Sequence, residues 1–281
     1  MKRLVLLVVG VMLSCCPKDL LGQAGTPPPY ETVVVPSGEL KLKGLLWKPL
    51  GRGPFAAVLF NHGSGPTNPA RAHTIGPVFA KHGYAFLFLF RRGDGLSSDQ
   101  GQFIRDVLNQ DAAAGGEQAR DRLMNGRLTQ EHLDDTLAGL AFLKTVPDVD
   151  SRRIAIAGHS FGGQLALLAA ERDRTIGAAV AFAAAAQRWE RSAELQERLV
   201  TAARNIEAPV FLIHAANDYS TKPARAMAAV REGVRKAYDM KIYPSVGATP
   251  AEGHAAVFTD IASWEGDVFR FLDQHVQRLE R

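Results

Sequence analysis

Five apolar runs without polar alternation restrict the possible folds of this chain more than any other feature. They are residues 55–60, 84–90, 154–157, 178–182 and 210–213, each bounded by Gly, Pro or polar residues. Such runs are typical of parallel strands, because helices cover both faces of a parallel sheet. Segments with helical spacing of apolar residues lie between the runs, so strands and helices alternate. We therefore expect an α/β fold with a mostly parallel, doubly wound sheet and helices on both faces.

Three segments fall outside this alternation. Thr32–Val35 and Leu40–Trp47 are predicted to form an antiparallel hairpin ahead of the parallel strands, joined by a turn that contains Pro and Gly. The stretches 101–127 and 187–204 are polar and helix-prone. We interpret both stretches as lid-like excursions over a site at the carboxyl ends of the strands, with surface padding as the alternative. The sequence contains no internal repeat and no sign of a second domain.

The N-terminus resembles a secretory leader. Lys2 and Arg3 precede an apolar run, Leu4–Leu13, that is too short to span a bilayer. Cleavage after Ala24 would remove residues 1–24, and the prolines at 27–29 would then belong to a short linker, residues 25–29. The alternative is a lipoprotein leader, with a lipid anchor on Cys15 or Cys16. Both routes predict export to the periplasm or the exterior, with no transmembrane segment in the mature chain.

Both cysteines of the chain lie in this leader. A mature chain would therefore have no disulfide, thiolate metal site or cysteine nucleophile. Loss of the leader also lowers the formal net charge from +4 to +2, and no dense basic patch remains that would suggest binding to nucleic acid. We find no metal-binding motif and no phosphate-binding glycine loop, so no metal or other cofactor is expected.

The motif Gly158-His159-Ser160-Phe161-Gly162 follows the apolar run 154–157 and precedes a helical segment. This strand–turn–helix context is the one that a nucleophilic serine in G-x-S-x-G requires. Glycines at both ends allow a sharp, strained turn that lifts the hydroxyl above the sheet. The alternative is a glycine-rich turn whose serine caps the helix. We predict that Ser160 is a nucleophile.

A serine hydroxyl needs an imidazole base and a carboxylate that orients this base, in the chain order Ser, acid, His. Of the two histidines that follow the last strands, His254 lies in a predicted loop and His275 on the terminal helix, so His254 is the expected base. Asp218 follows the run 210–213 directly and is the expected acid. It could instead serve only as a turn or helix-cap residue. Weaker candidates for the acid are Asp239, Glu190 and Glu194.

Two backbone N–H groups are expected to receive the oxyanion that forms during attack on a carbonyl. Phe161, directly after the nucleophile, should supply one. Ser64, in the glycine-rich loop after the run 55–60, should supply the other. His62 in the same loop and His159 beside the nucleophile are predicted to orient and pack their surroundings instead of acting as the base.

From about Tyr30 onward the chain resembles the dienelactone hydrolase and prolyl-oligopeptidase-like branch of the α/β-hydrolase superfamily. The matching segments are Asn61-His62-Gly63-Ser64-Gly65, Arg91-Arg92-Gly93-Asp94-Gly95, Asp148 to Gly163, Asp218 and His254. The resemblance implies an α/β-hydrolase catalytic domain over residues 30–281, in which Arg91 and Arg92 are structural. One departure is that dienelactone hydrolases proper use a cysteine nucleophile, where this chain has Ser160.

These features predict a serine hydrolase that cleaves small carboxylic esters through an acyl-enzyme on Ser160. A peptidase or amidase is the alternative reaction, because prolyl-oligopeptidase-like domains share these motifs. A third possibility is a binding protein that keeps the fold without catalysis.

Overall fold

The computed structural model describes residues 28–277, without the side chains of residues 111–114; the predicted leader, residues 1–24, lies outside this range. Its sheet has eight strands in the order β1-β2-β4-β3-β5-β6-β7-β8. The strands are β1 (Tyr30–Ser37), β2 (Leu40–Trp47), β3 (Phe55–Asn61), β4 (Tyr84–Phe90), β5 (Val149–His159), β6 (Ala178–Phe182), β7 (Val210–Ala215) and β8 (Tyr238–Tyr243). The predicted hairpin is β1–β2, and all pairs from β4 to β8 are parallel. The mostly parallel sheet predicted from the apolar runs is therefore confirmed.

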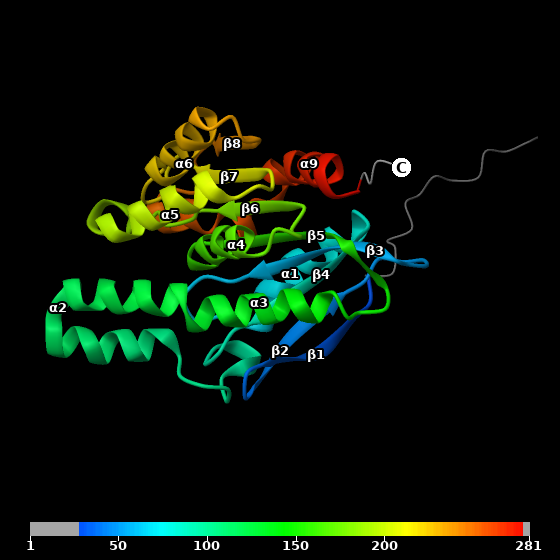
Figure 1. Ribbon diagram of the computed structural model, residues 1–281, viewed down its shortest axis with the longest axis horizontal. Coiled ribbons are helices and arrows are strands. Elements are labelled where there is room, and N and C mark those ends of the chain that lie inside the picture. The colour runs from blue at the N-terminus through cyan, green and yellow to red at the C-terminus, as the bar shows by residue number, and fades with distance from the viewer. Residues whose placement is uncertain (1–27, 278–281) are drawn as a thin grey trace, which may run out of the picture.

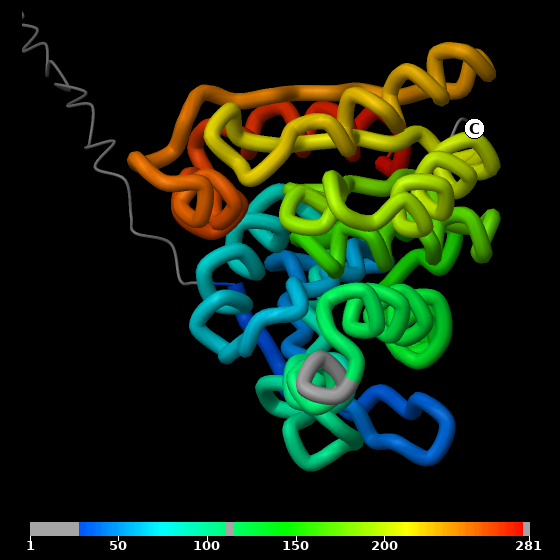
Figure 2. The backbone as a smooth tube through the Cα atoms, turned by 90° about the vertical axis from the view of Figure 1, so that its left-hand side faces the viewer, coloured from blue at the N-terminus to red at the C-terminus, as the bar shows by residue number. Residues whose placement is uncertain are grey.

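Helices cover both faces of this sheet (Figures 1 and 2). They are α1 (Pro69–Lys81), α2 (Ile104–Thr129), α3 (Glu131–Leu143), α4 (Phe161–Arg172), α5 (Ala193–Asn205), α6 (Lys222–Gly233), α7 (Pro250–His254), α8 (Ala256–Thr259) and α9 (Ile261–Leu272). Leu- and Ala-rich side chains of α3 to α6 pack against one face of the sheet. Aromatic side chains dominate the other face, where Phe79 of α1 and Trp264 of α9 meet Phe86 and Phe182. Each face thus has its own apolar core.

The first predicted excursion, 101–127, lies largely within α2, which is broken into a helical hairpin. Within α2, Gly116 adopts a φ of 72° and a ψ of −175°, which breaks the helix. The chain then folds back, so that the two arms of α2 lie side by side at one end of the molecule (Figure 1). A positive φ of this size is easily accessible only to glycine.

The prediction of a second excursion at residues 187–204 is mostly wrong. Residues from Ala193 onward form α5, the crossover helix between β6 and β7. Leu195, Leu199 and Ala202 recur at helical spacing on its inner face and are buried in the core beneath the sheet. Only the segment that precedes α5, with a short 3₁₀ turn at Trp189–Arg191, remains outside the sandwich.

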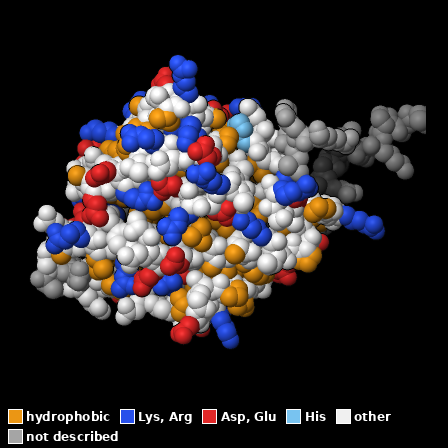
Figure 3. Space-filling model, in the orientation of Figure 1, with side chains coloured by type: hydrophobic (Ala, Val, Ile, Leu, Met, Phe, Trp, Pro, Cys, Tyr) orange, Lys and Arg blue, Asp and Glu red, His pale blue; other side chains and the backbone are white. Residues whose placement is uncertain are grey.

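Charged side chains of both signs are interspersed over the face seen in Figure 3, in keeping with the small net charge of the chain. Among residues 28–277, no helix has the combined length and apolarity needed to cross a bilayer.

Candidate active site

Ser160 lies on a sharp turn between β5 and α4 that its flanking glycines make possible. Its φ of 56° and ψ of −117° are unusual for a residue with a side chain, so the backbone is strained at this point. A Cβ at Gly158 would overlap the backbone oxygen of Gly162, and one at Gly162 would overlap the backbone oxygen of Asn61. The turn therefore requires glycine at both positions. It holds Ser160 at the carboxyl end of β5.

The structure brings Ser160 together with the two distant residues predicted to act with it. The hydroxyl Oγ of Ser160 lies 2.9 Å from His254 Nε2, within hydrogen-bonding distance. On the other side of the ring, His254 Nδ1 lies 2.7 Å from Asp218 Oδ1. This chain of hydrogen bonds requires the tautomer in which Nδ1 carries the proton and Nε2 accepts one from the serine. His254 is thus placed to act as a base toward Ser160.

His254 is the last residue of a short helix, α7, and the prediction that it lies in a loop is wrong. A capping box starts this helix: the hydroxyl of Thr249 accepts a hydrogen bond from the N–H of Glu252, and Glu252 accepts one from the N–H of Thr249. Pro250 at the first helical position favours the same start. The helix fixes the direction from which the imidazole approaches Ser160.

Asp218 lies just after β7 and is buried together with its partners. Oδ1 accepts hydrogen bonds from His254 and from the backbone N–H of Tyr219, which lies 2.7 Å away. Oδ2 accepts one from Nδ1 of His214 at 2.8 Å. Burial by itself would raise the pKa of Asp218, but the hydrogen bonds from His214 and His254 hold this pKa below 3.8. Asp218 is therefore an anion over the whole neutral range.

His214 is the part of this arrangement that sequence reasoning missed. It lies within β7, and its side chain is buried beside that of Asp218. The available signal was a histidine at the end of an apolar strand, four residues before the expected acid. In a single sequence this pattern also fits an ordinary packed histidine.

The two predicted oxyanion donors belong to segments that adjoin the serine. Phe161 is the first residue of α4 and is buried. Ser64 follows Gly63, and a Cβ built on Gly63 would lie 3.5 Å from Ser160 Cβ. The loop between β3 and α1 thus passes directly beside the nucleophile.

Arg91, at the end of β4, contacts both of these segments. Its Nη2 donates a hydrogen bond to the carbonyl oxygen of Gly63 at 2.9 Å, and its guanidinium lies over the ring of Phe161 at 5.5 Å. In a trans peptide the carbonyl and the next N–H point in opposite directions. By binding the Gly63 carbonyl, Arg91 fixes the direction of the Ser64 N–H. Burial lowers the pKa of Arg91 to about 10, which leaves it charged at neutral pH.

The other histidines near the serine have supporting positions. His62 forms a hydrogen bond through Nδ1 to the carbonyl of Gly63 at 2.8 Å, and its Nε2 accepts one from the N–H of Arg91. His159 forms a hydrogen bond through Nε2 to the carbonyl of His254 at 2.8 Å. Burial, together with the nearby imidazole of His254, lowers the pKa of His159 to about 3. These contacts fit the expectation that His62 and His159 orient and pack.

The weaker candidates for the acid and base lie elsewhere in the structure. Glu190 pairs with Lys222 on the surface, and Glu194 accepts a hydrogen bond from Asn125. Asp239 lies in β8, and His275 packs against Phe271 near the C-terminus. None of these four has a hydrogen bond to His254 or Ser160 among residues 28–277.

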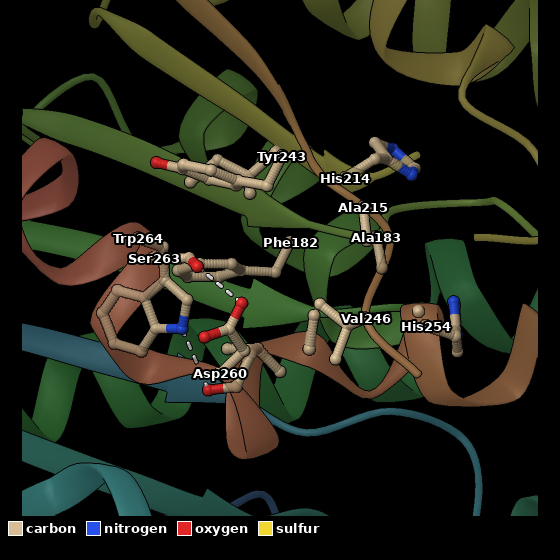
Figure 4. Close-up of a pocket in the computed structure, with 14 residues that line it drawn as sticks. Phe182, Ala183, His214, Ala215, Tyr243, Val246, His254, Asp260, Ser263 and Trp264 are labelled. Carbon is tan, nitrogen blue, oxygen red and sulfur yellow. Dashed lines mark hydrogen bonds between the residues drawn. The ribbon is translucent and has the colours of Figure 1, made fainter. Parts of the chain in front are cut away.

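A small apolar cavity of about 20 Å³ lies behind His254 (Figure 4). Phe182, Tyr243 and Trp264 line it, and His214 and His254 lie apart from each other on the side away from Tyr243 and Trp264. This volume admits about one water molecule, so the cavity is too small for an ester. Substrate must therefore reach Ser160 from another direction.

Within the described residues, no group of three or more His, Cys, Asp or Glu side chains is arranged to hold a metal ion.

Comparison with known proteins shows what this chain is similar to. A quorum-quenching protein of Acinetobacter baumannii is 25% identical over 144 residues, which are 51% of this chain and only 40% of that protein. An esterase of Pyrococcus furiosus superposes with a TM-score of 0.64 at 17% identity, over 92% of this chain and 97% of that one. An acylaminoacyl peptidase of Pyrococcus horikoshii superposes with a TM-score of 0.63 at 17% identity, over 91% of this chain and 43% of that one.

At such low identity the two structural likenesses show the fold alone, and they confirm the α/β-hydrolase fold. The model of the dienelactone hydrolase family matches residues 43–257, which include Ser160, Asp218 and His254. Because this match covers most of the chain, we conclude that the chain belongs to the dienelactone hydrolase family.

Proposed function

We propose that this protein is a serine hydrolase that cleaves carboxylic esters through an acyl-enzyme on Ser160. The observation that carries the proposal is the continuous chain of hydrogen bonds from Ser160 Oγ through His254 to Asp218, with distances of 2.9 and 2.7 Å. A nucleophile, its base and an orienting carboxylate within hydrogen-bonding distance are the elements of acyl transfer.

In the proposed mechanism, Ser160 Oγ attacks the ester carbonyl carbon while His254 Nε2 takes the hydroxyl proton. The negative charge on the carbonyl oxygen is received by the N–H groups of Phe161 and Ser64. His254 then gives its proton to the leaving alkoxide, the C–O bond breaks, and the acyl group remains on Ser160. Water attacks this acyl-enzyme as His254 takes its proton, and the acid product leaves with Ser160 restored.

Asp218 supports both halves of this cycle. Its negative charge stabilises the imidazolium that forms on His254 in each step. The hydrogen bond at Nδ1 also keeps the ring in the tautomer that presents a free Nε2 to the serine.

The experiment is a panel of p-nitrophenyl esters of increasing acyl length, run beside aminoacyl p-nitroanilides. We expect the esters to be hydrolysed and Ser160→Ala to lose this activity. Ser151→Ala, an exposed serine in the same strand β5, is the matched control and should keep it. Turnover of the anilides alone would favour the peptidase alternative, and Ser160→Ala activity within tenfold of wild type would exclude Ser160 as the nucleophile.

We further propose that the protein is exported. The support comes from the sequence of residues 1–24, with its basic start and short apolar run. Mass spectrometry of the protein from its native host should show these residues removed. A lipid-modified Cys15 or Cys16 would indicate anchoring to a membrane, and an intact Met1 would contradict export.

A further inference from the structure

Tyr219, which directly follows Asp218, is an exposed aromatic side chain in contact with His254. The centroids of the two rings lie 5.4 Å apart, and the angle between the ring planes is 73°, an edge-to-face arrangement. Even so, 47% of Tyr219 remains exposed. The other large apolar side chains with comparable exposure in residues 28–277 lie on β1, before β3, after α6 and on β8: Tyr30, Val34, Leu50, Val234 and Met240. Single exposed apolar side chains are ordinary on a protein surface. Tyr219 differs from them because it lies beside the base of the candidate active site.

The loop that carries Tyr219 is held on both sides of this residue. The backbone N–H of Tyr219 donates a hydrogen bond to Asp218 Oδ1 at 2.7 Å. The hydroxyl of the next residue, Ser220, donates one to Glu190 Oε1 at 3.1 Å, and Lys222 pairs with the same carboxylate at 3.0 Å. Glu190 belongs to the short turn before α5, so this turn supports the loop from outside. The ring of Tyr219 thus has a defined place before any substrate binds.

The proposed mechanism determines which part of an ester comes next to this ring. His254 Nε2 takes the proton of Ser160 Oγ, which lies 2.9 Å away, and then gives it to the leaving oxygen. Proton transfer requires the two atoms to approach to about 2.6–3.2 Å, so the leaving oxygen lies against the imidazole. The carbonyl oxygen is received elsewhere, by backbone N–H groups. The alcohol part of the ester is therefore the part that lies beside His254 and Tyr219.

The surroundings of Tyr219 favour an uncharged aromatic group. The charges of Glu190 and Lys222 neutralise each other in their ion pair, and the carboxylate of Asp218 is bonded to two imidazoles. This loop therefore offers no unpaired charge to attract an ionic alcohol. Two aromatic rings in edge-to-face or offset contact gain more free energy than the burial of their surface alone supplies. An aromatic alcohol should thus bind better here than a saturated alcohol of the same size.

We propose that Tyr219 determines specificity by contacting the alcohol part of the substrate, so that esters of uncharged aromatic alcohols are preferred over esters of saturated alcohols. The inference rests on the ester hydrolysis proposed above. A merely structural role for the ring would be to hold the imidazole of His254 in place. The two roles differ in one step, because the alcohol has already left before deacylation, whereas His254 acts in acylation and in deacylation.

The test compares benzyl acetate with cyclohexylmethyl acetate. Both are acetates of primary alcohols with a six-membered ring, so the acyl group is identical and the leaving groups differ mainly in aromatic character. Titration of the acetic acid released gives kcat/KM for each ester. We expect wild type to hydrolyse the benzyl ester about two- to tenfold more efficiently, the range that corresponds to one aromatic pair.

Variants assign this preference to the ring. Tyr219→Leu keeps an apolar side chain but removes the ring, and its benzyl-to-cyclohexylmethyl ratio should fall to about one. Tyr219→Phe keeps the ring and should keep the preference. Tyr30→Leu is the matched control, since Tyr30 is 52% exposed on β1 and the same substitution there should leave the ratio as in wild type.

Deacylation separates contact with the alcohol from support of the base. The slow release of p-nitrophenol from p-nitrophenyl trimethylacetate, after the initial burst, measures hydrolysis of the acyl-enzyme. Tyr219→Leu should slow acylation by benzyl acetate and leave this slow phase at the wild-type rate. If both steps slow by the same factor, the ring only holds His254 and the inference is overturned.

Other outcomes would also overturn the inference while leaving ester hydrolysis intact. They are a wild-type ratio at or below one, an unchanged ratio in Tyr219→Leu, loss of the preference in Tyr219→Phe, and an equal fall in Tyr30→Leu. If neither acetate is hydrolysed but simple p-nitrophenyl esters are, the preference for aromatic alcohols is again refuted. Failure with all esters would refute the proposed function itself.

Discussion

His214 is expected to position Asp218, and this role can be tested by changing only its hydrogen bond. In His214→Leu, Oδ2 of the buried Asp218 loses the donor that lies 2.8 Å away. A buried acceptor left unpaired costs about 1–3 kcal/mol, and more when it is charged. In His214→Asn, the side-chain nitrogen is the same number of bonds from Cα as Nδ1 of histidine, so the donor is retained.

We expect His214→Leu to lose about 2–3 kcal/mol of stability, which corresponds to a fall in Tm of roughly 4–10 °C for a chain of this size. Its kcat should fall about 10- to 100-fold, because Asp218 is then free to turn away from His254. His214→Asn should recover most of both losses. The measurements are a thermal melt and kcat for a p-nitrophenyl ester.

The pH dependence adds a readout that simple loss of packing would not produce. The pKa of Asp218 is depressed in the folded state, so its contribution to stability is present above the unfolded pKa of about 3.9 and is lost as pH falls through the folded pKa. Because His214 is one cause of that depression, the difference in Tm between wild type and His214→Leu should be full at pH 7 and shrink below about pH 4. If His214→Asn is no better than His214→Leu, or if His214→Leu keeps wild-type kcat, the positioning role is refuted.

Three further predictions concern the turn at Ser160, the loop between β3 and α1, and acid stability. Gly162→Ala should destabilise the fold by about 3 kcal/mol or more, because the new Cβ would overlap backbone atoms. Gly266→Ala, in open space on α9, should instead stabilise the fold by up to about 1 kcal/mol. Denaturant unfolding of the two variants distinguishes these outcomes. Arg91→Met should lower kcat at least about tenfold with little change in KM, since the N–H of Ser64, the proposed oxyanion donor, is then misdirected. Unchanged kcat in the folded variant would contradict this. Burial lowers the pKa of three histidines in the folded state: His62, His132 and His159. Below a pH of about 6.5, the ordinary histidine pKa, the unfolded chain therefore binds more protons than the folded chain. As a result, Tm should fall steadily as pH drops from about 6.5 toward 3. Equal Tm values at about pH 7 and pH 5 would refute this prediction.

The sheet and the residues that meet at Ser160 could be predicted from the sequence, because both leave local patterns in it. Apolar runs without polar alternation indicate buried parallel strands. Ser160 and Asp218 each follow the carboxyl end of such a strand, and these ends lie at one edge of the sheet. Contacts between distant polar side chains have no such local pattern. The bond from His214 to Asp218 and the contact of Arg91 with Gly63, in the loop between β3 and α1, therefore became visible only in the structure.

Helix boundaries and insertions were also difficult to predict, for a different reason. Residues 187–204 are polar on average, yet Leu195 and Leu199 suffice to bury one face of α5. Gly116 reverses the direction of α2, but a glycine within a helical pattern does not by itself reveal a reversal.

The most direct test of the central claim is to trap the acyl-enzyme. The protein is mixed with an ester whose acyl group is bulky and slow to leave, such as p-nitrophenyl trimethylacetate, quenched in acid, and analysed by mass spectrometry before and after digestion. We expect a mass increase of one acyl group, located on the peptide that contains Ser160 and absent from Ser160→Ala. Turnover of the ester with no adduct on Ser160, or with the acyl group on another residue, would contradict it.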